Sequence, residues 1–153
     1  MAATSQEDIA KLRKMTAGEM AECVVLRDEL HLDCAGNETP AGFRERPIIG
    51  ASSPGEGLGA GKMAWPHGFH LRYVALDPGA RSNHHVRDEE EVILLQKGEL
   101  TLHFDEGDVV IGPGDVFTVP IGKARSYSNG SSELTEAYIV RGGDHPSPPR
   151  LLE

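Results

Sequence analysis

The chain has 153 residues and a formal net charge of −9 at pH 7. A chain of this size is expected to form one domain with a substantial core, and no apolar run approaches the roughly 20 residues of a membrane span. The negative charge argues against nucleic acid or an anionic membrane as partner, because a binding face would have to overcome general repulsion. Without a basic segment followed by an apolar one at the start, a cytoplasmic location is expected.

Residues 1–64 are predicted to form an N-terminal arm followed by a lid. Ser5 with Asp8 resembles a capping box, so a helix is expected over 5–14, and Thr16 with Glu19 gives a second helix start. Residues 23–26 are expected to form a strand. Two cysteines are too few for a disulfide scaffold, so both are expected to be reduced.

The segment 36–61 is rich in glycine and proline, which favours a long surface loop or lid. Its large apolar residues are expected to hold it against the rest of the domain, and it is predicted to become ordered when a ligand binds. These residues are Phe43, Ile48, Ile49 and, just beyond the segment, Trp65.

Alternating apolar and polar residues predict short strands through the rest of the chain. The alternation covers 69–76, 100–104, 109–111, 116–119 and 134–141, with Gly, Pro and Asp turn signals between the runs. Strands this short and evenly spaced fit a sandwich or barrel. The last segment, 142–153, is predicted to be an extended tail that covers a barrel edge or a partner.

Two spaced motifs run through the middle of the chain. The pattern G-x5-H-x-H-x3-E-x6-G falls on Gly79, His85, Arg87, Glu91 and Gly98, and G-x5-P-x-G-x2-H-x3-N falls on Gly114, Pro120, Gly122, Arg125 and Asn129. Both spacings resemble those of the cupin family. The resemblance implies an all-β jelly-roll barrel over residues 65–141 and, by family habit, a homodimer.

The resemblance also implies a divalent metal (Fe, Mn, Ni or Zn) held by histidines and a glutamate. Here Arg87 and Arg125 stand where the family has its second and third histidines. Arginine has no lone pair to offer a metal, so neither can act as a ligand, and no cofactor is expected. The alternative is a rebuilt metal site made of His85, Glu91 and His84, which requires a bulge because consecutive strand residues point to opposite faces.

If the register follows the family, Arg87 and Arg125 project into the cavity beside Glu91. Two guanidinium groups against one carboxylate would make a positive pocket suited to a small-molecule acid, bound through arginine's forked donors. The other possibility is that Glu91 bridges the arginines as a polar plug. Tyr127, Arg72 and His103 are also predicted to contact the substrate.

These residues favour an enzyme of the isomerase, cyclase or lyase type, acting on a carboxylate- or carbonyl-bearing metabolite. Glu91 or His85 would move the proton while the arginines stabilise the anion. A metal-dependent dioxygenase with the rebuilt site and a non-catalytic metabolite-binding protein remain alternatives, because one barrel hosts many chemistries.

Overall fold

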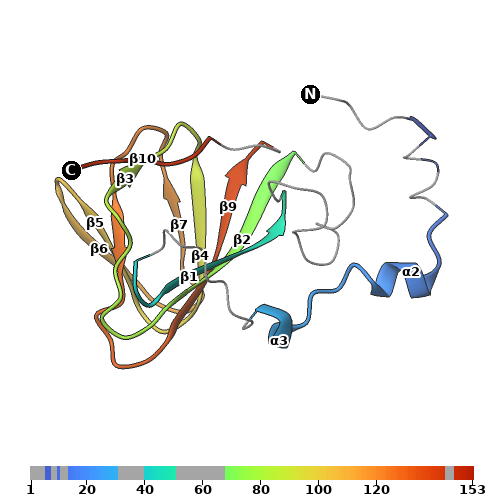
Figure 1. Ribbon diagram of the computed structural model, residues 1–153, viewed down its shortest axis with the longest axis horizontal. Coiled ribbons are helices and arrows are strands. Elements are labelled where there is room, and N and C mark those ends of the chain that lie inside the picture. The colour runs from blue at the N-terminus through green and yellow to red at the C-terminus, as the bar shows by residue number, and fades with distance from the viewer. Residues whose placement is uncertain (1–5, 8–9, 11–13, 31–39, 51–67, 144–146) are drawn as a thin grey trace.

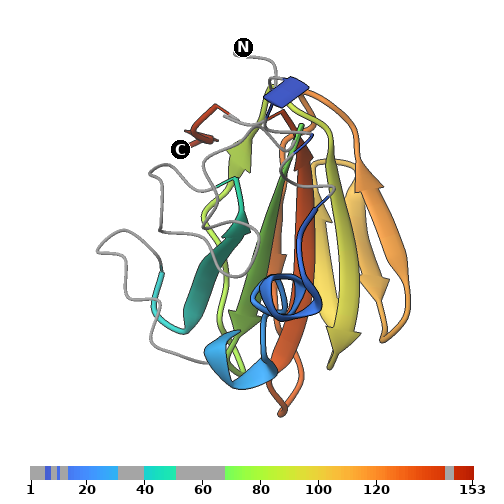
Figure 2. The ribbon, with the colours of Figure 1, turned by 90° about the vertical axis from the view of Figure 1, so that its right-hand side faces the viewer.

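The computed structural model describes residues 6–7, 10, 14–30, 40–50, 68–143 and 147–153 (Figure 1). Within these residues, ten strands form a five-stranded sheet in the order β1-β2-β9-β4-β7, a three-stranded sheet in the order β6-β5-β8, and a two-stranded pair of β10 and β3. Figure 2 shows β1, β2, β9 and β4 side by side, coloured teal, green, red and yellow. The described fold is all-β apart from short helices, as predicted. The elements are α2 (Ala17–Ala21), α3 (Arg27–Leu30), β1 (Phe43–Ile49), β2 (Phe69–Leu76), β3 (His85–Val86), β4 (Glu91–Lys97), β5 (Leu100–Phe104), β6 (Gly107–Ile111), β7 (Val116–Val119), β8 (Ser126–Ser128), β9 (Thr135–Gly142) and β10 (Arg150–Leu151).

The core lies between the two larger sheets and follows from the alternation of each strand. Alternate residues point to one face of a strand, so Ile93 and Leu95 of β4 pack inward with Ala137 and Ile139 of β9. Leu102 from the three-stranded sheet is fully buried against them. The inner faces of β4 and β9 therefore face the interior at every second residue, including Glu91 and Arg141.

The two motifs lie side by side in antiparallel fashion. The amide of Gly79 donates to the Asn129 carbonyl at 2.9 Å, and His85 and Arg125 exchange two backbone hydrogen bonds of 2.9 Å. The amide of Gly122 donates to the carbonyl of Arg87 at 2.9 Å. This pairing brings the chemically active positions of both motifs to the same end of the interior.

The N-terminal arm has the second predicted helix start but not the predicted strand. Thr16 and Glu19 form a complete capping box on α2. The strand prediction for 23–26 is wrong, because this stretch pairs with no described strand and instead leads into α3, where the amide of Leu26 donates to the Glu29 carboxylate at 2.7 Å. Leu30 then packs on the outer face of the five-stranded sheet.

Much of the arm and the lid lies outside the described residues. Of the helix predicted over 5–14, Gln6, Glu7 and Ala10 are helical, Lys14 lies in a turn, and the rest is not described. Trp65, Cys34 and the segment 51–61 are also outside, so the predicted ordering of the lid stays a prediction.

The part of the predicted lid that the structure describes contains a strand. Residues 43–49 form β1, which pairs with β2 at the edge of the five-stranded sheet, so the prediction of a loop there is wrong. The register shifts between Pro47 and Ile49. Proline cannot donate a ladder hydrogen bond and is tolerated at edges and bulges, which is why this strand does not read as one from its sequence.

The C-terminal tail ends on the barrel, where β10 pairs with β3. None of the described helices is long and apolar enough to cross a bilayer.

Candidate functional site

A cavity of about 530 Å³ opens beside the paired motifs. Its volume lies in the range of sites that hold small molecules. Strands from both larger sheets and the C-terminal tail contribute polar and apolar side chains to it. It is lined by Pro40, Phe43, Glu45, Ser82, Asn83, His85, Arg87, Tyr127, Ile139, Arg141, Pro148, Pro149 and Leu151.

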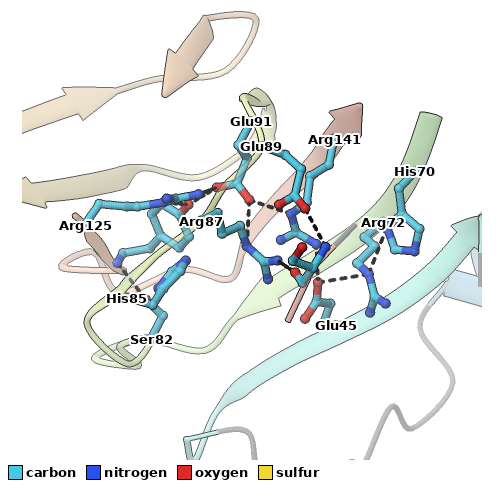
Figure 3. Close-up of polar contacts among 12 residues, drawn as sticks. Glu45, His70, Arg72, Ser82, His85, Arg87, Glu89, Glu91, Arg125 and Arg141 are labelled. Atoms are coloured by element: carbon cyan, nitrogen blue, oxygen red, sulfur yellow. Dashed lines mark hydrogen bonds and ion pairs between the residues drawn. The ribbon is translucent and has the colours of Figure 1, made fainter. Parts of the chain in front are cut away.

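Glu91 is the centre of a charged cluster beside the cavity, although it is fully buried and does not itself line the cavity (Figure 3). Glu91 on β4 and Arg141 on β9 are direct cross-strand partners, and Arg141 Nε donates to Glu91 Oε2 at 2.6 Å. Arg125 Nη2 lies 3.0 Å from Glu91 Oε1, and Arg87 Nε lies 3.6 Å from Oε2. Three guanidinium groups thus surround one carboxylate.

Arg87 and Arg125 have different access to the cavity. Arg125 has no exposed surface, and its Nε donates to the Tyr127 hydroxyl at 3.0 Å, while Nη1 donates to the Lys123 carbonyl at 3.1 Å. The Tyr127 hydroxyl in turn donates to Glu91. Arg87 lines the cavity and donates to the Ser147 carbonyl at 3.1 Å. Arg125 is therefore part of the buried support, whereas Arg87 lies at the cavity wall.

Burial and the neighbouring charges determine the protonation states of Glu91, Tyr127 and Arg87. Burial by itself would raise the pKa of Glu91, but the Arg141 and Arg125 charges outweigh it and lower the pKa to about 2. Burial and the Glu91 charge raise the pKa of Tyr127 far above its usual value. Burial lowers the pKa of Arg87 to about 10, which still leaves it charged at neutral pH. Glu91 is thus an anion and Tyr127 a neutral donor.

His85 has the properties of a proton acceptor at the cavity wall. Its Nδ1 lies 2.9 Å from the Asn83 carbonyl, and because a carbonyl oxygen only accepts, Nδ1 carries the hydrogen and Nε2 the lone pair. Burial, followed by the Arg125 charge, lowers the pKa of His85, although the Asn83 hydrogen bond opposes this. His85 is therefore neutral at pH 7. Its ring packs edge-on against Tyr127 at 5.6 Å between centroids.

Two charged residues of the site were missed from the sequence. Arg141 lines the cavity with Glu45, and Arg141 Nη1 lies 3.4 Å from Glu45 Oε1. Arg141 shares its strand face with Ile139, so the alternation of 134–141 carried a signal that it faces the interior. Glu45 gave no such signal, because its strand was predicted to be a loop.

Three predicted site residues lie elsewhere. His103 is on β5 but faces away from Leu102, and it contacts Asp108 at 2.8 Å and Ser128 at 2.6 Å. Arg72 does not line the cavity but contacts Glu45, which does: its Nε is 3.3 Å from both Glu45 Oε1 and His70 Nδ1 (Figure 3).

His84 is the third. It directly precedes β3 and is half-buried. Neither His84, His103 nor Arg72 lines the cavity.

Part of the chain matches a known protein family. Residues 72–141 match the family described as the cupin domain. This part of the chain is a cupin domain, as the two motifs predicted. The match spans both motifs and the strands β4 to β8, and therefore most of the core around Glu91. The comparison with curated proteins finds no match.

Solved structures share this cupin fold at low sequence identity. A polyketide cyclase, RemF from Streptomyces resistomycificus, is 18% identical over 85% of this chain and 84% of its own, with a TM-score of 0.67. A cupin 2 conserved barrel protein from Salinispora arenicola is 21% identical over 78% and 87%, with a TM-score of 0.57. An oxalate oxidase in complex with glycolate is 18% identical over 77% of this chain and 59% of its own, at 0.58. At these identities the likeness shows the fold alone.

The cupin resemblance implies a metal, and the residues around Glu91 do not fit one. Both carboxylate oxygens of Glu91 already bind guanidinium groups, and Oε1 also accepts from Tyr127. A dication placed there would lie among three fixed positive charges. Among the residues that the structure describes, no three His, Cys, Asp or Glu side chains converge as metal ligands. The set His85, Glu91 and His84 is not brought together.

Proposed function

We propose that this cupin is a small-molecule enzyme of the isomerase, cyclase or lyase type, acting on a carboxylate- or carbonyl-bearing metabolite. One observation carries the proposal. The cationic side chains of Arg87 and Arg141 and the neutral His85 line the same cavity. This places two anion-stabilising groups and one proton acceptor within reach of a single bound molecule.

In this mechanism Arg87 and Arg141 bind the acid group or the oxygen on which negative charge develops. Their charges act in a site where burial weakens screening by water, since the side chains of Arg87 and Arg141 are only 9% and 5% exposed. Phe43 of β1 and Ile139 of β9 line the same cavity and offer apolar surface for the body of the substrate. The favoured substrate is thus an acid or ketone with an apolar frame.

His85 accepts the proton through Nε2, while Asn83 holds its ring in the required tautomer. Glu91 is assigned to positioning rather than to proton transfer. Its pKa of about 2 leaves it too weak a base for the task, and its oxygens are engaged by the arginines. This assignment makes Glu91 the bridge between arginines that the sequence left open as an alternative.

The polyketide cyclase among the similar structures supports the proposal, because it shows that this fold can serve a cyclase. Its 18% identity carries no residue roles to this chain. A cytoplasmic location and a homodimer remain predictions.

Proton exchange tests the proposal before the natural substrate is known. A panel of aryl ketones and arylacetic acids is incubated in D2O with the protein, and loss of the α-proton is followed by NMR. We expect exchange with one or more members, abolished in His85→Gln and retained in His103→Gln, which changes a histidine outside the cavity. The rate should fall as the pH drops through the lowered pKa of His85, below its usual 6.5.

Binding without exchange across the panel would instead favour the non-catalytic metabolite-binding protein. Chelation separates the dioxygenase: exchange and binding should survive exhaustive treatment with EDTA. Loss on chelation, with recovery on adding one particular metal, would contradict the metal-independent mechanism.

A further inference from the structure

The C-terminal residues 147–152 lie along the cavity and are called the strap here. Its β10 pairs with β3 through two residue pairs, and the amide of Leu152 donates to the His84 carbonyl at 2.9 Å. Pro148, Pro149 and Leu151 of the strap form part of the cavity wall. The strap is therefore fixed to the strand that carries His85 and closes one side of the site.

Apart from the β10 pairing, exposed polar contacts fasten the strap: the Ser147 amide donates to the Glu89 carboxylate, and Arg150 pairs with Asp88. Its ion pair, between Arg150 and Asp88 at 2.9 Å, is formed by side chains that are 65% and 59% exposed. Exposed pairs of this kind contribute little to stability because water screens them. Leu151 is 63% exposed although it also faces the cavity. A segment with so little buried surface can open locally without unfolding the barrel.

The strap also occupies a donor that an acid ligand needs. A guanidinium binds a carboxylate with two hydrogen bonds through either its Nη1/Nη2 edge or its Nε/Nη2 edge. At Arg87 the Ser147 carbonyl takes Nη1 at 3.1 Å, and Glu91 Oε2 lies 3.6 Å from Nε. Both edges of Arg87 are therefore half occupied.

The donors of Arg141 are also occupied, like those of Arg87. Its Nε binds Glu91 at 2.6 Å and its Nη1 lies 3.4 Å from Glu45. The groups on Arg141 are charged and belong to the sheet, whereas Ser147 offers a neutral carbonyl on an exposed strap. Of these contacts, the one between Ser147 and Arg87 is the easiest to exchange for an anion.

We propose that the strap is an autoinhibitory element: the Ser147 carbonyl holds Arg87 in the closed state, and an acid ligand binds in bidentate fashion only when the strap releases it. The proposal rests on the proposed function for its ligand, an organic acid with an apolar body. Because the closed state does not bind, the apparent affinity equals the affinity of the open state multiplied by the fraction of molecules in which the strap is open.

Benzoate binding, measured by titration calorimetry, tests the proposal, with benzamide as the uncharged control ligand. A chain ending at residue 146 should bind benzoate about three- to tenfold more tightly than the full chain, which is the effect of removing one competing hydrogen bond. Asp88→Asn in the full chain should give a smaller gain and guards against misfolding of the shortened chain. Asp108→Asn is its matched control, since that carboxylate is 57% exposed in an ion pair of 2.8 Å away from the cavity.

The gain must disappear when Arg87→Ala is added to the shortened chain. Benzoate binding by the shortened chain and by Asp88→Asn that is no tighter than binding by the full chain would overturn autoinhibition. If Arg87→Ala still weakened that binding, the proposed anion pocket would be supported without the strap's role. Binding of benzoate to neither chain would contradict the anion pocket, and the strap's role with it.

Discussion

Two glutamates are buried in the same sheet, one on each face, and they differ in what surrounds them. Glu91 is fully buried on the inner face, between three guanidinium groups and beside a cavity. Glu136 is 3% exposed on the outer face, where the Tyr73 hydroxyl donates to it at 2.7 Å. Arg27 and Lys97 approach Glu136 only to 3.6 and 3.9 Å, with side chains 72% and 49% exposed.

The comparison shows that burial of a carboxylate does not by itself mark a site. Glu136 lies between α3 and the sheet, and its partners include a neutral hydroxyl and two largely exposed cations. Glu91 gathers fixed cations at the wall of a cavity, and some of their donors face the space where a ligand fits. Glu136 also lines a pocket, of about 360 Å³, with Arg27 and Lys97, so the inner face is distinguished by cations that are buried rather than largely exposed.

The largest effect is expected from removing the inner carboxylate. Glu91→Ala leaves three buried guanidinium groups without their counter-charge, which should lower the free energy of unfolding by about 3 to 5 kcal/mol. Glu136→Gln keeps most of its shape and a hydrogen-bonding oxygen, so its loss should be nearer 1 kcal/mol. Urea unfolding of both variants measures the difference. Equal losses would mean that the arginines around Glu91 are not held by its charge.

Acid should act selectively on the inner cluster. The pKa of Glu91 is lowered from 4.5 to about 2 in the folded chain, so the unfolded chain binds more protons between these values. The stability that Glu91 contributes is therefore complete above pH 4.5 and is lost as the pH falls to 2, by about 3 kcal/mol.

Unfolding measured across this pH range should show that loss in the normal chain and in Glu136→Gln, and much less of it in Glu91→Gln. An unchanged acid profile in Glu91→Gln would assign the loss to other carboxylates.

The sequence predicted the parts of this arrangement that depend on local spacing. The two motifs placed His85, Arg87, Glu91 and Arg125 in one region, and alternation predicted β2, β5 and β9. What it could not supply was the register between distant strands. Arg141 becomes a partner of Glu91 only because β9 pairs with β4, fifty residues apart in the chain.

Glu45 and the strap were missed for the same reason, because their contacts depend on pairing between segments that are distant in the chain. Glu45 enters through β1, whose proline and weak alternation read as loop, and whose strand character comes from pairing with β2. The strap depends on contacts between Ser147 and Arg87, sixty residues apart. Such contacts are set by how the tail returns to the barrel, which no local pattern encodes.

A smaller effect is expected from changing the shape of a cavity cation while keeping its charge. Arg87→Lys loses the planar fork, so benzoate should bind more weakly by roughly 1.5 kcal/mol, or about tenfold. Arg125→Lys should reduce binding less directly, since Arg125 is fully buried and does not line the cavity. Its main cost should be in stability. A larger loss of benzoate binding from Arg125→Lys than from Arg87→Lys would reverse the roles given to the two arginines.

The smallest effects belong to the outer face. Arg27→Ala and Lys97→Ala each remove a mostly solvated cation from Glu136, and such pairs contribute below about 1 kcal/mol. The loss in unfolding free energy should shrink further in 1 M salt, where charges are screened within about 3 Å. Tyr73→Phe provides the contrast, because it removes the hydroxyl that donates to the buried Glu136, and its effect should persist in salt. A salt-resistant loss above 2 kcal/mol from Arg27→Ala or Lys97→Ala would show that the outer cations are held as firmly as the inner arginines, and would remove the difference between the two faces.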